Sequence, residues 1–408
     1  MWKTALVSML NRMIADGTLD LKFPDGTQQR FGDGGAPRVG ATIHQDDLIK
    51  KIILNPEMAV GEAYMDGTVT IEDDDLYGFL ELAVKNVRRI DNVILQRVMS
   101  FVRQVLRNWR QFNPAKKSKT NVEHHYDLSG ELYDLFLDED RQYSCAYFSD
   151  PSMSLENAQR AKKEHIAKKL CIEPGMTVLD IGCGWGGMAI TLARDYRAKV
   201  VGVTLSEEQH KLASERVKEA GLADQIDIRI QDYRHVNESF DRIVSVGMFE
   251  HVGVPHYREY FRNVHARLRP DGVALIHTIG RMMPPGWTSP WIDKYIFPGG
   301  YCPSLSETSA AIEHEDLYMT DVEVWRLHYA ETLKNWHDRF MSNAERAREL
   351  YDDRFVRMWR YYLIACESTF RWGNQCVFQI QLTHDQEAVP LTRDYISEPE
   401  KELAHAAE

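Results

Sequence analysis

The segment from Thr177 to Gly187, TVLDIGCGWGG, constrains the fold more than any other part of the chain. Its residues 178–181, apolar except for Asp180, predict a buried strand, and the four glycines that follow predict a tight turn before a helix. Glycine lets the backbone pass close beneath a ligand, and the unpaired N–H groups of a helix N-terminus face the same point. The segment therefore predicts a site for a sizeable polar ligand, although its G-x-G-x-G-G spacing differs from the G-x-G-x-x-G of dinucleotide-binding folds.

Strands and helices alternate around this segment. Helices are expected over 154–170, 187–196, 207–220 and 257–268, and strands over 177–181, 199–204, 227–230, 242–246 and 273–278. Such alternation predicts an α/β domain with a parallel sheet covered on both faces. Ligands of these sheets bind beyond the carboxyl ends of the strands. We therefore expect one crevice where these strand ends meet: Gly182, Thr204, Asp232, Phe249 and Ile279.

The first 90 residues show a different pattern of predicted strands and helices. Alternating residues 19–31 around Pro24-Asp25-Gly26 predict a β-hairpin. Helical spacing is expected over 43–54 and 76–87, and a strand with a turn at Asp66-Gly67 over 59–71. The pattern predicts a small α+β domain over residues 1–90.

The charge of the chain is unevenly distributed. The net charge of −12 argues against nucleic acid as a partner, yet residues 85–119 hold ten basic residues and one acid. Within 91–120, an amphipathic helix is expected at 91–109, followed by a polar linker. Two interpretations stay open for this helix: a core helix with a solvated face, or a helix that rests on an anionic membrane surface. The basic side chains in question are Arg97, Arg103, Arg107 and Arg110.

Composition suggests a cytoplasmic protein. The six cysteines have no C-x-x-C spacing, so neither a metal site nor a disulfide framework is expected. Residues 1–13 are too interrupted by polar side chains for a secretory signal, and no segment approaches the ~18 apolar residues that span a bilayer. Residues 391–408 are expected to form a charged tail.

The string DIGCGWGG resembles motif I of S-adenosylmethionine-dependent methyltransferases. Five further segments, in this order, are similar to the cyclopropane-fatty-acyl-phospholipid synthase family: YSCAYF (143–148), VGVTLSEEQ (201–209), VSVGMFEHVG (244–253), LIHTIG (275–280) and LHYAETLKNWHDRF (327–340). The resemblance covers about residues 120–383. It implies a Rossmann-like class I methyltransferase domain with a seven-stranded, mainly parallel sheet over 121–390. The additional N-terminal domain is similar to that of the phospholipid-acting bacterial members.

The resemblance implies methyl transfer from S-adenosylmethionine to the cis double bond of an unsaturated phospholipid acyl chain. A carbocation then loses a proton to a bound bicarbonate, and the ring closes. The implied bicarbonate ligands are the backbones of Cys145 and Ile279 and the side chains of Glu250, His277 and Tyr329. The implied residues of the S-adenosylmethionine site are Tyr143, Ser144, Asp180, Gly182, Gly184, Gly186, Thr204, Gln209, Tyr233 and Arg234.

Each of these side chains has a simpler interpretation. Glu250 ends a strand and could only orient a ligand, His277 on a buried strand could be a packing residue, and Tyr329 could belong to the core. Cys145 could suggest a nucleophile, but the reaction needs no thiol. The aromatic run 282–303 is expected to form an acyl-chain tunnel or lid, with core packing as the alternative.

Other functions stay open at this point. A related fatty-acyl C-methyltransferase would share the motifs and give a methyl-branched or methylene product. A small-molecule methyltransferase would need neither the basic region nor the aromatic run, and a lipid-binding protein without activity would not need motif I. The expected partners are an anionic membrane at its inner face, contacted peripherally, and a second copy of the chain in a homodimer.

Overall fold

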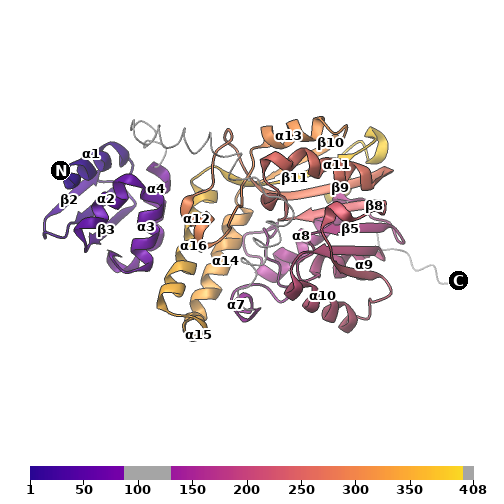
Figure 1. Ribbon diagram of the computed structural model, residues 1–408, viewed down its shortest axis with the longest axis horizontal. Coiled ribbons are helices and arrows are strands. Elements are labelled where there is room, and N and C mark those ends of the chain that lie inside the picture. The colour runs from indigo at the N-terminus through magenta and orange to yellow at the C-terminus, as the bar shows by residue number, and fades with distance from the viewer. Residues whose placement is uncertain (87–129, 398–408) are drawn as a thin grey trace.

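The computed structural model describes residues 1–86 and 130–397, and Figure 1 shows two units side by side. The first unit has a four-stranded sheet in the order β2-β1-β3-β4. Its strands are β1 (Thr18–Lys22), β2 (Gln28–Gly32), β3 (Arg38–Ile43) and β4 (Val69–Ile71), and its helices are α1 (Trp2–Met13), α2 (Asp46–Leu54), α3 (Pro56–Met65) and α4 (Leu76–Asn86). The hairpin predicted over 19–31 is confirmed, since β1 and β2 pair antiparallel.

The strand predicted over 59–71 is wrong in its first half, where the chain forms α3. Pro56 begins this helix in its first turn, where a missing N–H costs nothing. Ala63, Tyr64 and Met65 are buried in succession because α3 is covered on more than one side, by α2 and by α16 (Asp353–Arg371). Burial of this kind removes the 3.6-residue periodicity that identifies a helix in a sequence. Neither α1 nor β3 was predicted.

The second unit contains the predicted seven-stranded sheet, in the order β10-β11-β9-β8-β5-β6-β7. The strands are β5 (Thr177–Ile181), β6 (Lys199–Thr204), β7 (Ile226–Ile230), β8 (Phe240–Val246), β9 (Leu268–Arg281), β10 (Tyr318–Trp325) and β11 (Gln375–Thr383). Among these seven described strands, β11 is antiparallel to the other six. The fold class expected from the sequence is thereby confirmed.

Helices cover both faces of this sheet. Val178, Val200 and Val244 pack on one face with α8 (Leu155–Lys169) and α9 (Gly187–Tyr196). Leu179 and Ile243 point to the other face, where α11 (Tyr257–Arg267) and α13 (Leu305–Glu313) lie. Successive strand residues thus alternate between two apolar layers. The helix α10 (Glu207–Glu219) packs beside β6 and β7.

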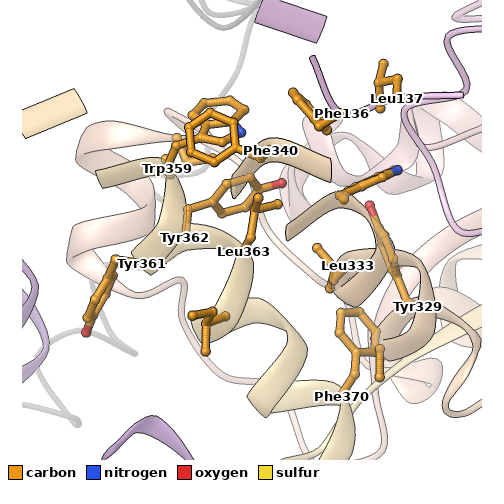
Figure 2. Close-up of a cluster of buried hydrophobic side chains, with 14 of the residues drawn as sticks. Phe136, Leu137, Tyr329, Leu333, Phe340, Trp359, Tyr361, Tyr362, Leu363 and Phe370 are labelled. Carbon is orange, nitrogen blue, oxygen red and sulfur yellow. The ribbon is translucent and has the colours of Figure 1, made fainter. Parts of the chain in front are cut away.

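A third core lies between the sheet and the N-terminal unit. It is built mainly by α7 (Gly130–Asp134), α12 (Pro290–Tyr295), α14 (His328–Ser342), α15 (Ala344–Leu350) and α16. Figure 2 shows its aromatic side chains, with Tyr329 beside Phe370 on one side and Trp359 near Tyr362 on the other. This aromatic core adjoins the carboxyl edge of the sheet, since Ile279 and Val377 pack against or within it.

The N-terminal unit docks on this core through α3. The Arg357 Nε donates a hydrogen bond to the Met65 carbonyl at 2.7 Å, and Lys294 and Tyr295 of α12 both reach Glu62. Trp291 of α12 is buried, with its ring centroid 4.8 Å from that of Tyr361. Trp291 therefore has the core-packing role that was the alternative for the aromatic run.

Two further predictions concern the chain outside these cores. The basic helix at 91–109 and the linker lie outside the described residues. The tail is described to Ser397 and ends in α17 (Asp394–Ser397), where the Tyr395 hydroxyl accepts a hydrogen bond from Gln381 at 2.9 Å. Within residues 1–86 and 130–397, no helix combines the length and apolar character that crossing a membrane requires.

Candidate active site

The glycine turn after β5 has the conformation that only glycine adopts readily. Gly182, Gly184 and Gly186 have φ values of 82°, 53° and 82°. The N–H groups of Gly182 and Cys183 donate to the Val203 carbonyl of β6 at 3.0 and 3.1 Å, which fixes the turn to the neighbouring strand. A Cβ built on Gly184 would meet no atom within 4 Å, so open space lies above the turn.

A pocket occupies this space, at the carboxyl ends of β5, β6, β7 and β8. Six of the predicted cofactor residues line it: Gly182, Gly184, Thr204, Gln209, Tyr233 and Arg234. The Thr204 hydroxyl donates to the Gln209 Oε1 at 2.8 Å. The Arg234 guanidinium donates to both oxygens of Asp232, at 2.9 and 2.6 Å, and this pairing helps keep the pKa of Asp232 low despite its burial.

Four predicted cofactor residues lie outside the lining of this pocket. The Tyr143 hydroxyl is 2.9 Å from the Tyr362 hydroxyl, and the Ser144 hydroxyl accepts a hydrogen bond from Lys162. Gly186 caps α9, and Asp180 is buried with its Oδ2 unpaired among the described residues. Their role in cofactor binding stays a prediction.

Of the five strand ends expected to meet in one crevice, Gly182, Thr204 and Asp232 line this pocket. Phe249 instead packs in the core beneath α11, and Ile279 packs against the aromatic core. The lining also holds residues that the sequence did not point to: Gln231, Met248, His251 and His256.

Glu250 lies in the short 3-10 helix η4 (Phe249–His251), next to the pocket residues Met248 and His251, but does not itself line the pocket. Its Oε1 accepts a hydrogen bond from the Ile279 N–H at 2.6 Å, which joins two of the predicted residues. Among the described residues its Oε2 is buried without a hydrogen-bond partner. Burial raises the pKa of Glu250 to about 7, so a large fraction of the carboxyl is protonated at neutral pH.

Tyr329 and Cys145 lie close enough to Glu250 to share its electrostatic environment. Burial raises the pKa of Tyr329 well above its ordinary value, and Tyr143, Cys145 and Glu250 add to the shift. The Cys145 thiol is also buried, which raises its pKa and keeps it protonated. A protonated thiol is a poor nucleophile, which fits the expectation that the side chain of Cys145 does no chemistry.

His277 contacts a different set of side chains. Its Nδ1 lies 3.1 Å from the Gln379 Nε2, and its ring stands edge-on to Trp325 with centroids 5.2 Å apart. Burial lowers its pKa well below the ordinary value, with a contribution from Lys162. The structure therefore groups Cys145, Glu250, Ile279 and Tyr329, and it records no hydrogen bond or ring contact between the His277 side chain and this group in the described residues.

Comparison with known proteins gives a consistent result. The family model for mycolic acid cyclopropane synthetase matches residues 113–380, and a model for a domain of unknown function, DUF7884, matches residues 5–90. The chain belongs to the mycolic acid cyclopropane synthetase family. It is 39% identical, over 88% of its length, to the cyclopropane-fatty-acyl-phospholipid synthase of Escherichia coli strain K12, and the match covers 94% of that protein.

Two further members of the family bear on the function. The chain is 35% identical to a tuberculostearic acid methyltransferase of Mycobacterium tuberculosis, over 92% of this chain and 90% of that one. A crystal structure of a mycolic acid cyclopropane synthase complexed with SAH and CTAB is 34% identical, with a TM-score of 0.62, and covers 65% of this chain and 97% of the other. The chain is therefore an S-adenosylmethionine-dependent methyltransferase, and the pocket over the glycine turn is the candidate cofactor site.

Proposed function

We propose that this family member transfers the methyl group of S-adenosylmethionine to the cis double bond of an unsaturated phospholipid acyl chain and closes a cyclopropane ring. An alkene is a weak nucleophile, so the reaction needs a dry site that holds it close to the methyl donor. The observation that carries the proposal is Glu250, a buried carboxyl next to the cofactor-pocket residues Met248 and His251, whose Oε2 has no hydrogen-bond partner among the described residues. Ring faces in the aromatic core suit a transient cation on the acyl chain.

The pocket residues fit the cofactor. Positive φ at Gly182 and Gly184 leaves the turn without side chains, and the space above Gly184 is open. Thr204 and Gln209 present a hydroxyl and an amide at the position expected for the ribose. When bound, S-adenosylmethionine supplies an electrophilic methyl group.

The residues near Glu250 also fit a small anion. A protonated Glu250 offers an O–H at Oε2, and the phenol of Tyr329 stays protonated because burial raises its pKa. The carbonyls of Cys145 and Ile279 can accept the single proton of bicarbonate. Bicarbonate held there would supply the acceptor for the proton that ring closure releases. His277, which contacts Gln379, stays a predicted ligand.

The reaction is tested by mass analysis of phospholipids from cells that express the chain. We expect acyl chains heavier by one CH2 whose double bond is lost, and no such product from the Glu250→Gln variant. Unchanged phospholipids, with the methyl group found on a small polar acceptor, would overturn the proposal.

A second product class is favoured by one relative, the tuberculostearic acid methyltransferase. A fatty-acyl C-methyltransferase that gives a methylene or methyl-branched chain would use the same cofactor site and the same cation. The mass gain would be equal for cyclopropane and methylene products. Oxidative cleavage separates them, because only the methylene product keeps a double bond that is cut.

Contact with membranes is a further part of the proposal. We propose that residues 85–119 dock the enzyme on the anionic inner face of the membrane, so that the acyl chain enters without crossing water. Basic residues near an anionic surface contribute at best about 1 kcal/mol each, and salt screens them. Charge reversal at Arg97, Arg103, Arg107 and Arg110 should abolish co-sedimentation with anionic vesicles and spare activity on detergent-dispersed lipid. Equal co-sedimentation would overturn this docking, and sedimentation velocity tests the proposed homodimer.

A further inference from the structure

A buried lysine of α8, Lys162, contacts the candidate site but has no assigned role in the proposed reaction. Lys162 is 0% exposed, and its ammonium donates hydrogen bonds to the Gln142 Oε1 at 2.7 Å and to the Ser144 hydroxyl at 2.8 Å. It forms no ion pair within 4.0 Å in the described part of the chain. A buried ammonium carries a desolvation penalty of several kcal/mol, and burial lowers the pKa of Lys162 to about 8. Packing alone would be served better by an apolar residue.

Both acceptors of Lys162 belong to the segment 142–145, which leads to the Cys145 backbone. Gln159, one turn earlier on α8, donates to the Ser144 carbonyl at 2.9 Å and to the Gln142 carbonyl at 3.2 Å. Two side chains of α8 thus hold this segment by hydrogen bonds. Beyond it, the Ala146 N–H donates to the Thr332 hydroxyl of α14 at 3.0 Å.

The same polar network reaches the glycine turn. The Gln142 Nε2 donates to Asp140 at 3.0 Å, and Asp140 is ion-paired with Lys163 and Arg216. The Arg216 guanidinium also donates to the Trp185 carbonyl, inside the turn, at 2.7 Å. A Cβ built on Gly187 would lie 2.3 Å from the Gln142 Nε2, so this side chain packs directly on the start of α9.

We propose that Lys162 is a positioning residue for the reaction, which holds segment 142–145 in register with the glycine turn. In this register Cys145 lies in the same buried cluster as Tyr329, which is near Glu250. The inference rests on the proposed function for its effect on turnover. Lys162 itself does not line the cofactor pocket, but segment 142–145 contains Tyr143 and Ser144, two implied residues of the S-adenosylmethionine site. Removal of the ammonium should therefore lower kcat and also weaken cofactor binding.

The test compares Lys162→Met with Arg160→Met, which removes an exposed cation from the same helix. We expect Lys162→Met to lower kcat at least tenfold and to raise the Kd for S-adenosylmethionine at least threefold. Amide hydrogen exchange in peptides covering 139–147 should become at least tenfold faster, with Arg160→Met like the parent. Because Lys162 acts through Ser144, adding Ser144→Ala to Lys162→Met should lower kcat by less than twofold further.

Several outcomes would overturn the proposal. Unchanged exchange over 139–147 would show that Lys162 does not hold the segment, and a tenfold weaker Kd with unchanged kcat would assign it to the cofactor instead. If Lys162→Met does not fold, Ser144→Ala alone must accelerate exchange over 139–147, and failure to do so rejects the idea. Exchange and cofactor binding need no lipid, so a parent enzyme that makes no cyclopropane would reject the proposed function and leave this test standing.

Discussion

Replacing Glu250 by Gln should make the enzyme more stable at alkaline pH and nearly inactive. The Gln carbonyl can still accept the Ile279 N–H that Glu250 accepts at 2.6 Å, while the titratable group is removed. The cofactor pocket should be unaffected, because Glu250 does not line it. Turnover should fall at least a hundredfold, since a neutral amide can neither ionise nor offer the O–H that would hold the proton acceptor.

The size of the stability effect follows from the pKa. Burial raises the pKa of Glu250 from 4.5 to about 7 in the folded chain, a difference of about 2.5 pH units. At about 1.4 kcal/mol per unit, ionisation of this buried group destabilises the fold by about 3 kcal/mol. Because the folded pKa is the higher one, the stability is present in full below pH 4.5 and is lost as the pH rises through 7. The Gln variant should lack this loss.

The assay is urea unfolding of the parent, Glu250→Gln and the exposed control Glu215→Gln at pH values between 4.5 and 8. Other buried groups, such as Asp180 and His251, titrate in all three proteins, so their contribution cancels in the difference. The difference in unfolding free energy between Glu250→Gln and the parent should grow by about 3 kcal/mol across this range. A difference that stays constant with pH would show that Glu250 is not a buried neutral carboxyl, and the reasoning would fail.

Three further predictions follow from the site and the domain contacts. Gly184→Val should weaken S-adenosylmethionine binding at least a hundredfold in calorimetric titration. The control Gly175→Val should not, since Gly175 also has a positive φ and open surroundings but lies at the surface. Binding by Gly184→Val within threefold of the parent would contradict this prediction. Bicarbonate depletion should slow turnover and added bicarbonate should restore it, whereas an indifferent rate would leave Glu250 itself as the base. Trp291→Ala should destabilise the chain by ~3–5 kcal/mol in urea unfolding, and the exposed Trp2→Ala by far less. A loss below ~1 kcal/mol would show that the packing of Trp291 in the aromatic core contributes little to stability.

Hydrophobic periodicity and turn residues predicted those helices and strands whose sequence pattern matches their burial. From β5 to β9 every predicted strand and helix is present, because the helices show the 3.6-residue period and the strands are short apolar runs that alternate with them. The prediction was wrong at α3, which is buried on more than one side and shows neither the helical nor the strand periodicity. The strands β10 and β11 were not located, since β11 is buried along almost its whole length and gives no alternation.

The candidate site divides in the same way. Side chains that follow strand ends, such as Thr204 and Tyr233, could be placed in one crevice because parallel strands end at one edge of a sheet. The resemblance named Glu250 and Tyr329, but their proximity is visible only in the structure. Tyr329 lies in α14, 79 positions after Glu250 in the sequence.

Lys162 belongs to no motif, and an amphipathic helix with several lysines is expected to be solvent-exposed from its sequence. Its burial arises from segment 142–145 folding over α8, a contact between residues 18 and 20 positions apart whose partners are an amide and a hydroxyl. Because these partners are neutral, the sequence shows no pairing of opposite charges that would predict the contact. The register of segment 142–145 against the glycine turn is therefore visible only in the tertiary structure.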